Sequence, residues 1–309
     1  MSLLFYCRHN KDAAADYVAA LVKAGYRETY EIEKADFLLL DHDLPGYHAS
    51  RPYIKAITTK PKFIYAHVPY SYFFWDGIIE PTATLCNFVV GSGAVEAMRI
   101  YGYPYRVEAV GFTGCHVQAF QPSRGTKLLF APAHPVHDGK YPNPESLTQI
   151  QEASQKILDN LSYFESVTIR YANSLKDCGL EAFEGAPVIF EHIEPYTTPN
   201  IRQDALASIA CADLVISQCT FGYLAIASGK PTLFYGYRDA IPNTREGYVK
   251  HYDTWKHIFH FPLIFEDMPI DDILAMRWYE GESIANWKYQ NIGHDFAADK
   301  FIEIVRECL

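Results

Sequence analysis

Residues 211–236 read Cys211-Ala-Asp-Leu-Val-Ile-Ser-Gln-Cys-Thr-Phe-Gly-Tyr-Leu-Ala-Ile-Ala-Ser-Gly-Lys-Pro-Thr-Leu-Phe-Tyr-Gly236. The apolar run Leu214–Ile216 is typical of a strand that is buried on both faces. The small or polar residues after it mark a helix start, which the side chain of Ser217 or Thr220 is expected to cap. Gly229 and the proline that follows end this helix, and the apolar residues beyond predict the next parallel strand.

This strand–helix–strand unit has a chemical consequence. A helix that begins at the carboxyl end of a strand presents unpaired backbone N–H groups and the positive end of its dipole, which together favour a phosphate or another anion. The alternative is an ordinary unit whose helix is capped and binds no ligand. The stretch by itself leaves both interpretations open.

Bulk properties narrow the class of protein. The chain has 309 residues, which favours two domains, and its formal net charge of −10 disfavours a broad nucleic-acid surface without excluding a local basic groove. Its seven cysteines are scattered with no Cys-x-x-Cys pair, which disfavours a disulfide framework or zinc knuckle. The N-terminal apolar run is too short for a signal peptide, and no run reaches the roughly 18 apolar residues of a membrane span. We therefore expect a soluble, cytoplasmic protein.

The first half of the chain alternates apolar strands with helical segments, which predicts an α/β domain with a parallel sheet. The predicted strands lie at residues 3–7, 37–40, 62–66, 87–90 and 106–111, and the predicted helices at residues 12–24 and 94–101.

Polar side chains follow three of these strands, at the sheet edge where α/β proteins carry out chemistry. Arg8 follows the first predicted strand, and Asp41 and Asp43 follow the second. His67 follows the third, at residues 62–66. Arg8 is a candidate anion ligand, whereas His67, Asp41 and Asp43 are candidate general bases. The structural alternatives are a solvated arginine, a capping carboxylate and a histidine that holds its loop by hydrogen bonds.

A polar stretch, Gln121–Gly125, predicts the linker between two domains. The second half repeats the first, with strands predicted at residues 127–131, 167–171, 188–191, 214–216 and 232–235, and helices at residues 144–161 and 202–210. An edge strand at residues 262–265 and helices at residues 271–278 and 297–308 complete the chain. We expect domains at residues 1–121 and 126–290, with residues 291–309 returning as a helix to the first.

Three further side chains lie at or just beyond strand ends of the second half: His134, Lys140 and Arg170. They are candidate donor ligands because parallel strand ends lie side by side, although Lys140 is also explained as a solvated surface residue. His134, His137 and Asp138 suggest a metal site, but the proline between the two histidines disfavours the helical geometry that would let them share an ion. We expect no bound metal.

Three motifs resemble the GT-B glycosyltransferases, and most closely the branch that includes CDP-glycerol glycerophosphotransferases. The second half opens with Lys127-Leu-Leu-Phe-Ala-Pro-Ala-His-Pro135 and later carries Ala212-Asp-Leu-Val-Ile-Ser-Gln-Cys-Thr-Phe-Gly222. The first half closes with Asn87-Phe-Val-Val-Gly-Ser92, then a helix and Tyr101-Gly-Tyr-Pro104. The resemblance implies two tandem Rossmann-like domains of GT-B type that face a central cleft.

The resemblance also implies a function, the transfer of a sugar or polyol phosphate from a nucleotide-activated donor to a hydroxyl acceptor. The donor phosphates would bind Ser217, Gln218, Thr220, Phe221 and Gly222. His134, Lys140 and Arg170 would assist, and a first-domain base, His67 or Asp41, would take the acceptor's proton. The nucleotide sugar is a co-substrate, so the family implies no further cofactor.

Three other functions remain open on the sequence. The first is an enzyme similar to UDP-N-acetylglucosamine 2-epimerases, which would form product from the donor alone. The second is a two-lobed module that binds a nucleotide or sugar without turnover. The third is a phage-type DNA glycosyltransferase, which the net charge of −10 disfavours.

Overall fold

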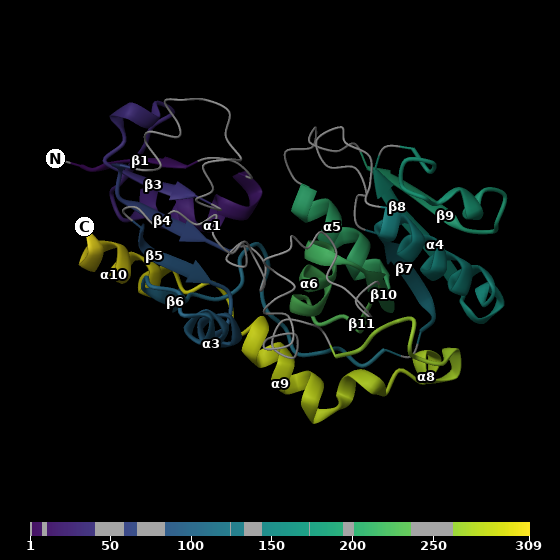
Figure 1. Ribbon diagram of the computed structural model, residues 1–309. Helices are drawn as coiled ribbons and strands as arrows, with labels where there is room; N and C mark the ends of the chain where they lie inside the picture. Colours follow the sequence, from purple (N-terminus) through teal and green to yellow (C-terminus); the bar gives the residue numbers. More distant parts are fainter. Residues whose placement is uncertain are drawn as a thin grey trace. The chain divides into compact units, whose positions relative to one another are not determined.

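The computed structural model describes residues 2–7, 11–40, 59–66, 84–123, 125–132, 144–172, 174–193, 201–235 and 262–309. These residues form two compact units, each built on one sheet (Figure 1). The first unit runs to Val117 and resumes at Lys288, and the second takes the described residues from Gln118 to Trp287. These divisions lie a few residues before the predicted ones.

The first unit holds a sheet in which every neighbouring pair of described strands is parallel. In sheet order the strands are β2 (Arg27–Glu28), β1 (Leu4–Cys7), β3 (Phe37–Leu40), β4 (Lys62–Tyr65), β5 (Thr84–Val89) and β6 (Val107–Ala109). The strands predicted from apolar runs are confirmed. The short strand β2 was missed because it consists of two charged residues, which carry no apolar signal.

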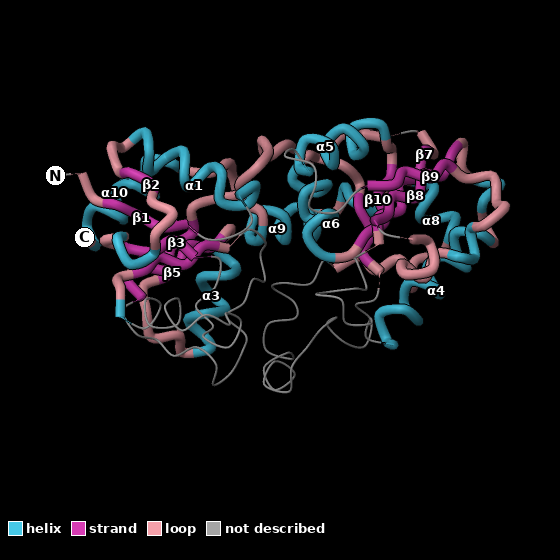
Figure 2. The backbone as a smooth tube through the Cα atoms, turned by 90° about the horizontal axis from the view of Figure 1, so that it is seen from above, coloured by secondary structure: helices cyan, strands magenta, loops and turns pink. Residues whose placement is uncertain are grey.

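Helices cover both faces of this sheet. Figure 2 shows α1 (Lys11–Lys23) and α10 (Ala298–Cys308) on one face and α3 (Ser92–Tyr101) on the other. The ring of Phe301 in α10 packs edge-on against Tyr17 of α1 and Phe88 of β5, with ring centroids 5.2 and 4.8 Å apart. The last helix therefore supplies part of the core on which the first strands pack.

Asp295 lies just before α10, where the chain has returned to the first unit. It contacts the residues up to Val117, which end the chain's first pass through this unit. It forms an isolated parallel bridge with Phe112, and its carboxylate accepts a hydrogen bond of 2.5 Å from the backbone N–H of Val117. The Nδ1 atom of His116 lies 2.9 Å from the other carboxylate oxygen. The last residues of the first pass are thus held to the returning segment.

The second unit also holds a sheet whose described strands pair in parallel throughout. In sheet order the strands are β11 (Thr232–Phe234), β10 (Leu214–Ser217), β7 (Lys127–Ala131), β8 (Ser166–Ala172) and β9 (Ile189–Ile193). The first strand of the unit, β7, is central, and the chain builds outward from it in both directions. All five strands were predicted.

Two pairs of helices cover this second sheet. Figure 2 shows α4 (Pro144–Leu158) and α8 (Ile270–Ala275) on one face, and α5 (Ile201–Cys211) and α6 (Cys219–Ala227) on the other. The remaining described helical elements are α9 (Glu282–Asn291) and the 3₁₀ turns Ile32–Lys34, Leu161–Tyr163, Glu181–Phe183 and Trp278–Glu280.

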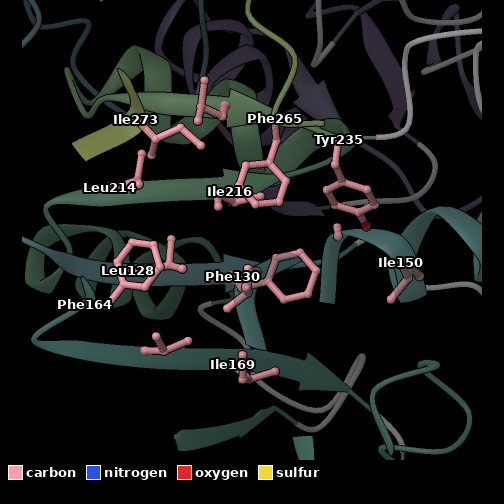
Figure 3. Close-up of a cluster of buried hydrophobic side chains, with 14 of the residues drawn as sticks. Leu128, Phe130, Ile150, Phe164, Ile169, Leu214, Ile216, Tyr235, Phe265 and Ile273 are labelled. Carbon is pink, nitrogen blue, oxygen red and sulfur yellow. The ribbon is translucent and has the colours of Figure 1, made fainter. Parts of the chain in front are cut away.

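The core of the second unit lies under α4 and α8. Alternate strand residues point to this face, among them Leu128 and Phe130 of β7 and Leu214 and Ile216 of β10 (Figure 3). The residues between them, such as Val215, are equally buried and face α5 and α6. Burial on both faces explains why the strands of this unit have nearly continuous apolar runs.

Some predictions for the last part of the chain need correction. Residues 262–265 do not form a full strand; Ile264 makes only an isolated bridge to Phe234. The helix predicted at residues 271–278 ends earlier, at Ala275, because Met276 takes a left-handed conformation with φ 54°. Helix α9 was not predicted, since its polar sequence lacks a clear apolar period.

Candidate functional site

The candidate site lies where the two central strands of the second sheet end. Strand β7 leads to α4 and its neighbour β10 leads to α6, and these two helices lie on opposite faces of the sheet. Ligands of open α/β sheets bind at such a switch point, outside the carboxyl ends of the strands. The residue between β10 and α6 is Gln218, so the helix begins directly at this edge.

A row of residues crosses the sheet beside this edge. Ser217 pairs in register with Phe234 of β11 and with Ala131 of β7. Phe130 of β7 pairs with Ile169 of β8, so the next residues along, Ala131 and Arg170, also lie side by side. Arg170 pairs in turn with Glu191 of β9. The middle of the row is formed by small side chains, which leaves space for the first turn of α6.

The hydroxyl of Ser217 holds the two strand ends together. Its side chain is fully buried, and Oγ donates a hydrogen bond of 2.6 Å to the carbonyl of Ala131. The prediction that Ser217 or Thr220 caps the helix is therefore wrong. The residue at the N-cap is Gln218, whose side chain makes no capping bond and instead donates to Oε1 of Gln149 at 3.4 Å.

The first turn of α6 consequently has no side-chain cap from its N-cap residue. Its N–H groups keep their capacity to donate, and the positive end of the helix dipole lies at the strand ends. Thr220 is exposed on this turn and Phe221 is partly exposed. The turn thus offers amide donors and one hydroxyl to an anion.

Two contacts fix this turn on the row beneath it. Gly222 lies so close to Phe234 that a Cβ atom added at this glycine would come within 2.7 Å of the ring. One residue earlier, the ring of Phe221 lies 5.7 Å from the guanidinium carbon of Arg170, within the range of a cation–π contact.

Besides the Phe221 ring, the buried cation of Arg170 has two hydrogen-bond partners. Its side chain is 4% exposed, and Nη1 donates to a carboxylate oxygen of Glu191 and, at 2.7 Å, to Oγ of Ser208 in α5. Ser208 donates in turn to the same carboxylate oxygen at 2.6 Å. The guanidinium is therefore neutralised and held in place by two neighbouring elements.

The structure brings together six of the predicted site residues. Ser217, Gln218, Thr220, Phe221 and Gly222 share one strand end and one helical turn, and Arg170 reaches that turn through Phe221. The predicted residues Arg8, Asp41, His67, His134 and Lys140 lie outside the described residues, as do His137 and Asp138.

Sequence reasoning missed Glu191, Ser208 and Gln149. Glu191 shares one face of β9 with Ile189 and Ile193, which was the available signal, but its partner depends on the order of strands in the sheet. Within the described residues no group of three or more His, Cys, Asp or Glu side chains is placed to hold a metal ion. Among the same residues, no helix combines the length and apolar character of a membrane span.

Comparisons with known proteins agree in fold but not in sequence. No protein-family model matches the chain, and no curated protein matches its sequence. MnaA of S. aureus, solved with UDP, is 11% identical with a TM-score of 0.56, over 99% of this chain and 96% of that one. The UDP-GlcNAc 2-epimerase of Neisseria meningitidis, bound to UDP-GlcNAc, is 12% identical with a TM-score of 0.53, over 99% and 100%.

A glycosyltransferase is similar to the same extent. AviGT4, which is involved in avilamycin A biosynthesis, is 11% identical with a TM-score of 0.50, over 99% of this chain and 98% of that one. At these identities the likeness establishes the fold alone. The predicted α/β fold with two tandem Rossmann-like domains of GT-B type is confirmed, whereas membership of the CDP-glycerol branch stays a prediction.

Proposed function

We propose that the protein is a glycosyltransferase that moves a sugar or polyol phosphate from a nucleotide-activated donor to a hydroxyl acceptor. The observation that carries the proposal is the start of α6, an uncapped helical turn at the switch point of the second sheet. The UDP and UDP-GlcNAc bound to structures of the same fold support a nucleoside diphosphate as the anion.

The turn would act on the group that leaves. When the bond between donor phosphate and transferred group breaks, negative charge grows on the leaving phosphate. Backbone amides of Thr220, Phe221 and Gly222, with the Thr220 hydroxyl, would stabilise that charge because they are fixed before the reaction begins. His134 and Lys140, which both follow strand β7 in the sequence, are proposed to contribute further donors.

The acceptor would be activated by the first unit. In an inverting sugar transfer the acceptor oxygen attacks the sugar carbon, its proton passes to a base, and the nucleoside diphosphate departs. In polyol phosphate transfer the acceptor oxygen attacks the phosphorus next to the polyol, its proton passes to the base, and the nucleoside monophosphate departs. His67 is the proposed base because a histidine accepts a proton near neutral pH, and Asp41 is the alternative. Arg8 is proposed to bind an anionic part of the acceptor.

A second candidate function is that of a 2-epimerase. The specific observation in its favour is that the fold match extends over the whole of the N. meningitidis enzyme. An epimerase would use the same nucleotide-binding turn but would need no acceptor, so the two functions differ in what must be added to the donor.

The experiment is calorimetric titration of the protein with UDP-, GDP-, CDP- and ADP-linked donors, sugars and polyols alike, followed by assays with the donor that binds. Saturable binding of one donor is expected, and failure of all four to bind would refute both enzymatic proposals. Acceptor-dependent release of a nucleoside diphosphate, or of a nucleoside monophosphate from a polyol-phosphate donor, supports the transferase. An altered sugar formed from the donor alone supports the epimerase. Binding without either product would identify a two-lobed binding protein, and salt-sensitive retention on duplex DNA would identify a DNA-modifying enzyme.

A further inference from the structure

The ion pair between Arg170 and Glu191 lies at an unusual place for a purely structural contact. Arg170 is buried, whereas 33% of the Glu191 side chain is exposed. Burying the cation costs desolvation energy that its attraction to the carboxylate often fails to offset, so the pair is weak evidence for a gain in stability. This one lies in the row of residues beneath the first turn of α6, on the same face of the sheet. Its position suggests a role in shaping that turn.

Arg170 is poorly placed to touch a ligand itself. Only 4% of its side chain is exposed, and Nη1 is shared between Glu191 and Ser208. A direct bond to a bound phosphate would require the guanidinium to leave both partners. The path from Arg170 to the candidate site instead runs through Phe221, whose ring lies over the guanidinium.

We propose that Arg170 is a positioning residue, which holds the ring of Phe221 and thereby orients the amide donors of the first turn of α6 toward the donor phosphates. Glu191 of β9 and Ser208 of α5 hold the guanidinium in place. A shift of the Phe221 ring would therefore break its contact with the cation. This inference rests on the proposed nucleotide-binding function of that turn.

Three properties support this chain of contacts. A guanidinium is planar and can stack on a ring while it bonds a carboxylate, which an ammonium group cannot do equally well, and Arg170 contacts both Phe221 and Glu191. On the other side of Phe221, Gly222 rests on Phe234, so the turn is supported at two successive residues. Finally, the helix has no side-chain cap that would otherwise define where its first amides point.

The experiment measures two quantities in the full chain: the Kd for UDP, and amide hydrogen exchange over Tyr223–Ala225, whose N–H groups bond to the first-turn carbonyls. The variants are Arg170→Met, Arg170→Lys, Phe221→Leu and the double variant Arg170→Met/Phe221→Leu. Lys156→Met is the matched control, because Lys156 is also a cation over an aromatic ring of this unit, with Nζ 4.5 Å from the centroid of Phe265, but lies on α4, across the sheet.

We expect Arg170→Met and Phe221→Leu each to weaken UDP binding by about five- to tenfold, the scale of a desolvated cation–π contact. The double variant should be no weaker than either single one, because both act through one contact. Arg170→Lys should recover part of the affinity, since it keeps the charge. Lys156→Met should lower the Tm and leave the Kd for UDP unchanged.

Several results would overturn the proposal. Unchanged Kd and unchanged exchange in folded Arg170→Met would show that the turn does not depend on the cation, and additive losses in the double variant would show that Arg170 acts on the ligand independently of Phe221. If Arg170→Met does not fold, the Kd for UDP and the amide exchange are compared in Arg170→Lys and Phe221→Leu instead. If the wild-type chain binds no UDP, the proposed function fails, and the exchange data on the unliganded protein still decide whether Arg170 holds the turn.

Discussion

Gly222 and Phe234 are packed so closely that the ring of Phe234 occupies the place where a side chain of residue 222 would begin. A Cβ atom at position 222 would lie 2.7 Å from Cζ and 2.8 Å from Cε1 of the ring. Both residues are buried, and the contact sets how near the first turn of α6 comes to the ends of the strands. The presence of glycine here is therefore a packing requirement.

The first prediction follows from this contact. Gly222→Ala should destabilise the second unit by about 1–3 kcal/mol, the usual cost of an overpacked core, and should weaken nucleotide binding because α6 must shift. Thermal unfolding and UDP titration measure the two effects. Combining Gly222→Ala with Phe234→Leu should recover much of the loss, and a double variant as unstable as Gly222→Ala would contradict the steric explanation.

A second prediction separates two hydroxyls that sequence analysis treated alike. Ser217→Ala should cost about 1 kcal/mol of stability, because it removes the buried bond to Ala131. Thr220→Ala should leave the Tm nearly unchanged, since Thr220 is exposed, but weaken donor binding by about 1–2 kcal/mol. The measurements are chemical denaturation and donor titration on both variants. The reverse pattern would mean that Ser217, not Thr220, serves the ligand.

A third prediction concerns pH. The hydrogen bond to Asp295 raises the pKa of His116 above its ordinary 6.5, with a further contribution from the charges of Asp295 and Asp16. The same bond, with the N–H of Val117, lowers the pKa of Asp295. Protonated His116 therefore contributes stability that is fully present below pH 6.5 and is lost as the pH rises through the raised pKa.

An NMR titration of His116 measures this pKa directly. In Asp295→Asn the pKa should fall back toward 6.5, while the amide oxygen still accepts from Val117 and keeps the segment in place. A His116 that titrates at or below 6.5 in the wild-type protein would show that the pair does not form in solution.

A fourth prediction concerns the proposed base. His67→Gln should lower turnover by about 10²–10⁴-fold, the usual contribution of a general base, because glutamine can hydrogen-bond but cannot take the proton. Donor affinity should barely change, since the donor is proposed to bind at α6. Near-normal turnover in His67→Gln, together with a folded but inactive Asp41→Asn, would assign the proton transfer to Asp41.

Much of the fold was predictable because the central strands of both sheets are buried on both faces. A strand buried on both faces is a short apolar run, as in β3 and β10, and apolar residues marked the other predicted strands as well, including edge strand β9, where Ile189 and Phe190 are exposed. The start of α6 was predictable from the same stretch, since the change from the apolar run Leu214–Ile216 to small or polar residues marks the end of the strand and a capping position.

The details of the site depended on contacts between distant parts of the chain. The hydroxyl of Ser217 could bond the first turn of α6 or the neighbouring strand, and only the strand order places Ala131 within reach. For the same reason Arg170 was predicted as a ligand, whereas the structure shows it paired with Glu191 and Ser208. Local sequence identifies which side chains are polar, but the sheet decides which partners they meet.

The return of the chain to its first unit has a consequence for synthesis on the ribosome. Four residues of α10 are buried in the core of that unit: Phe301, Ile302, Ile304 and Val305. The first unit therefore cannot complete its core until the second unit, Gln118–Trp287, has been translated, whereas all strands of the second unit precede α10 in the sequence. Until α10 is made, the nascent chain exposes apolar sheet surface around Phe88, and chaperone binding or aggregation should concentrate there rather than in the second unit.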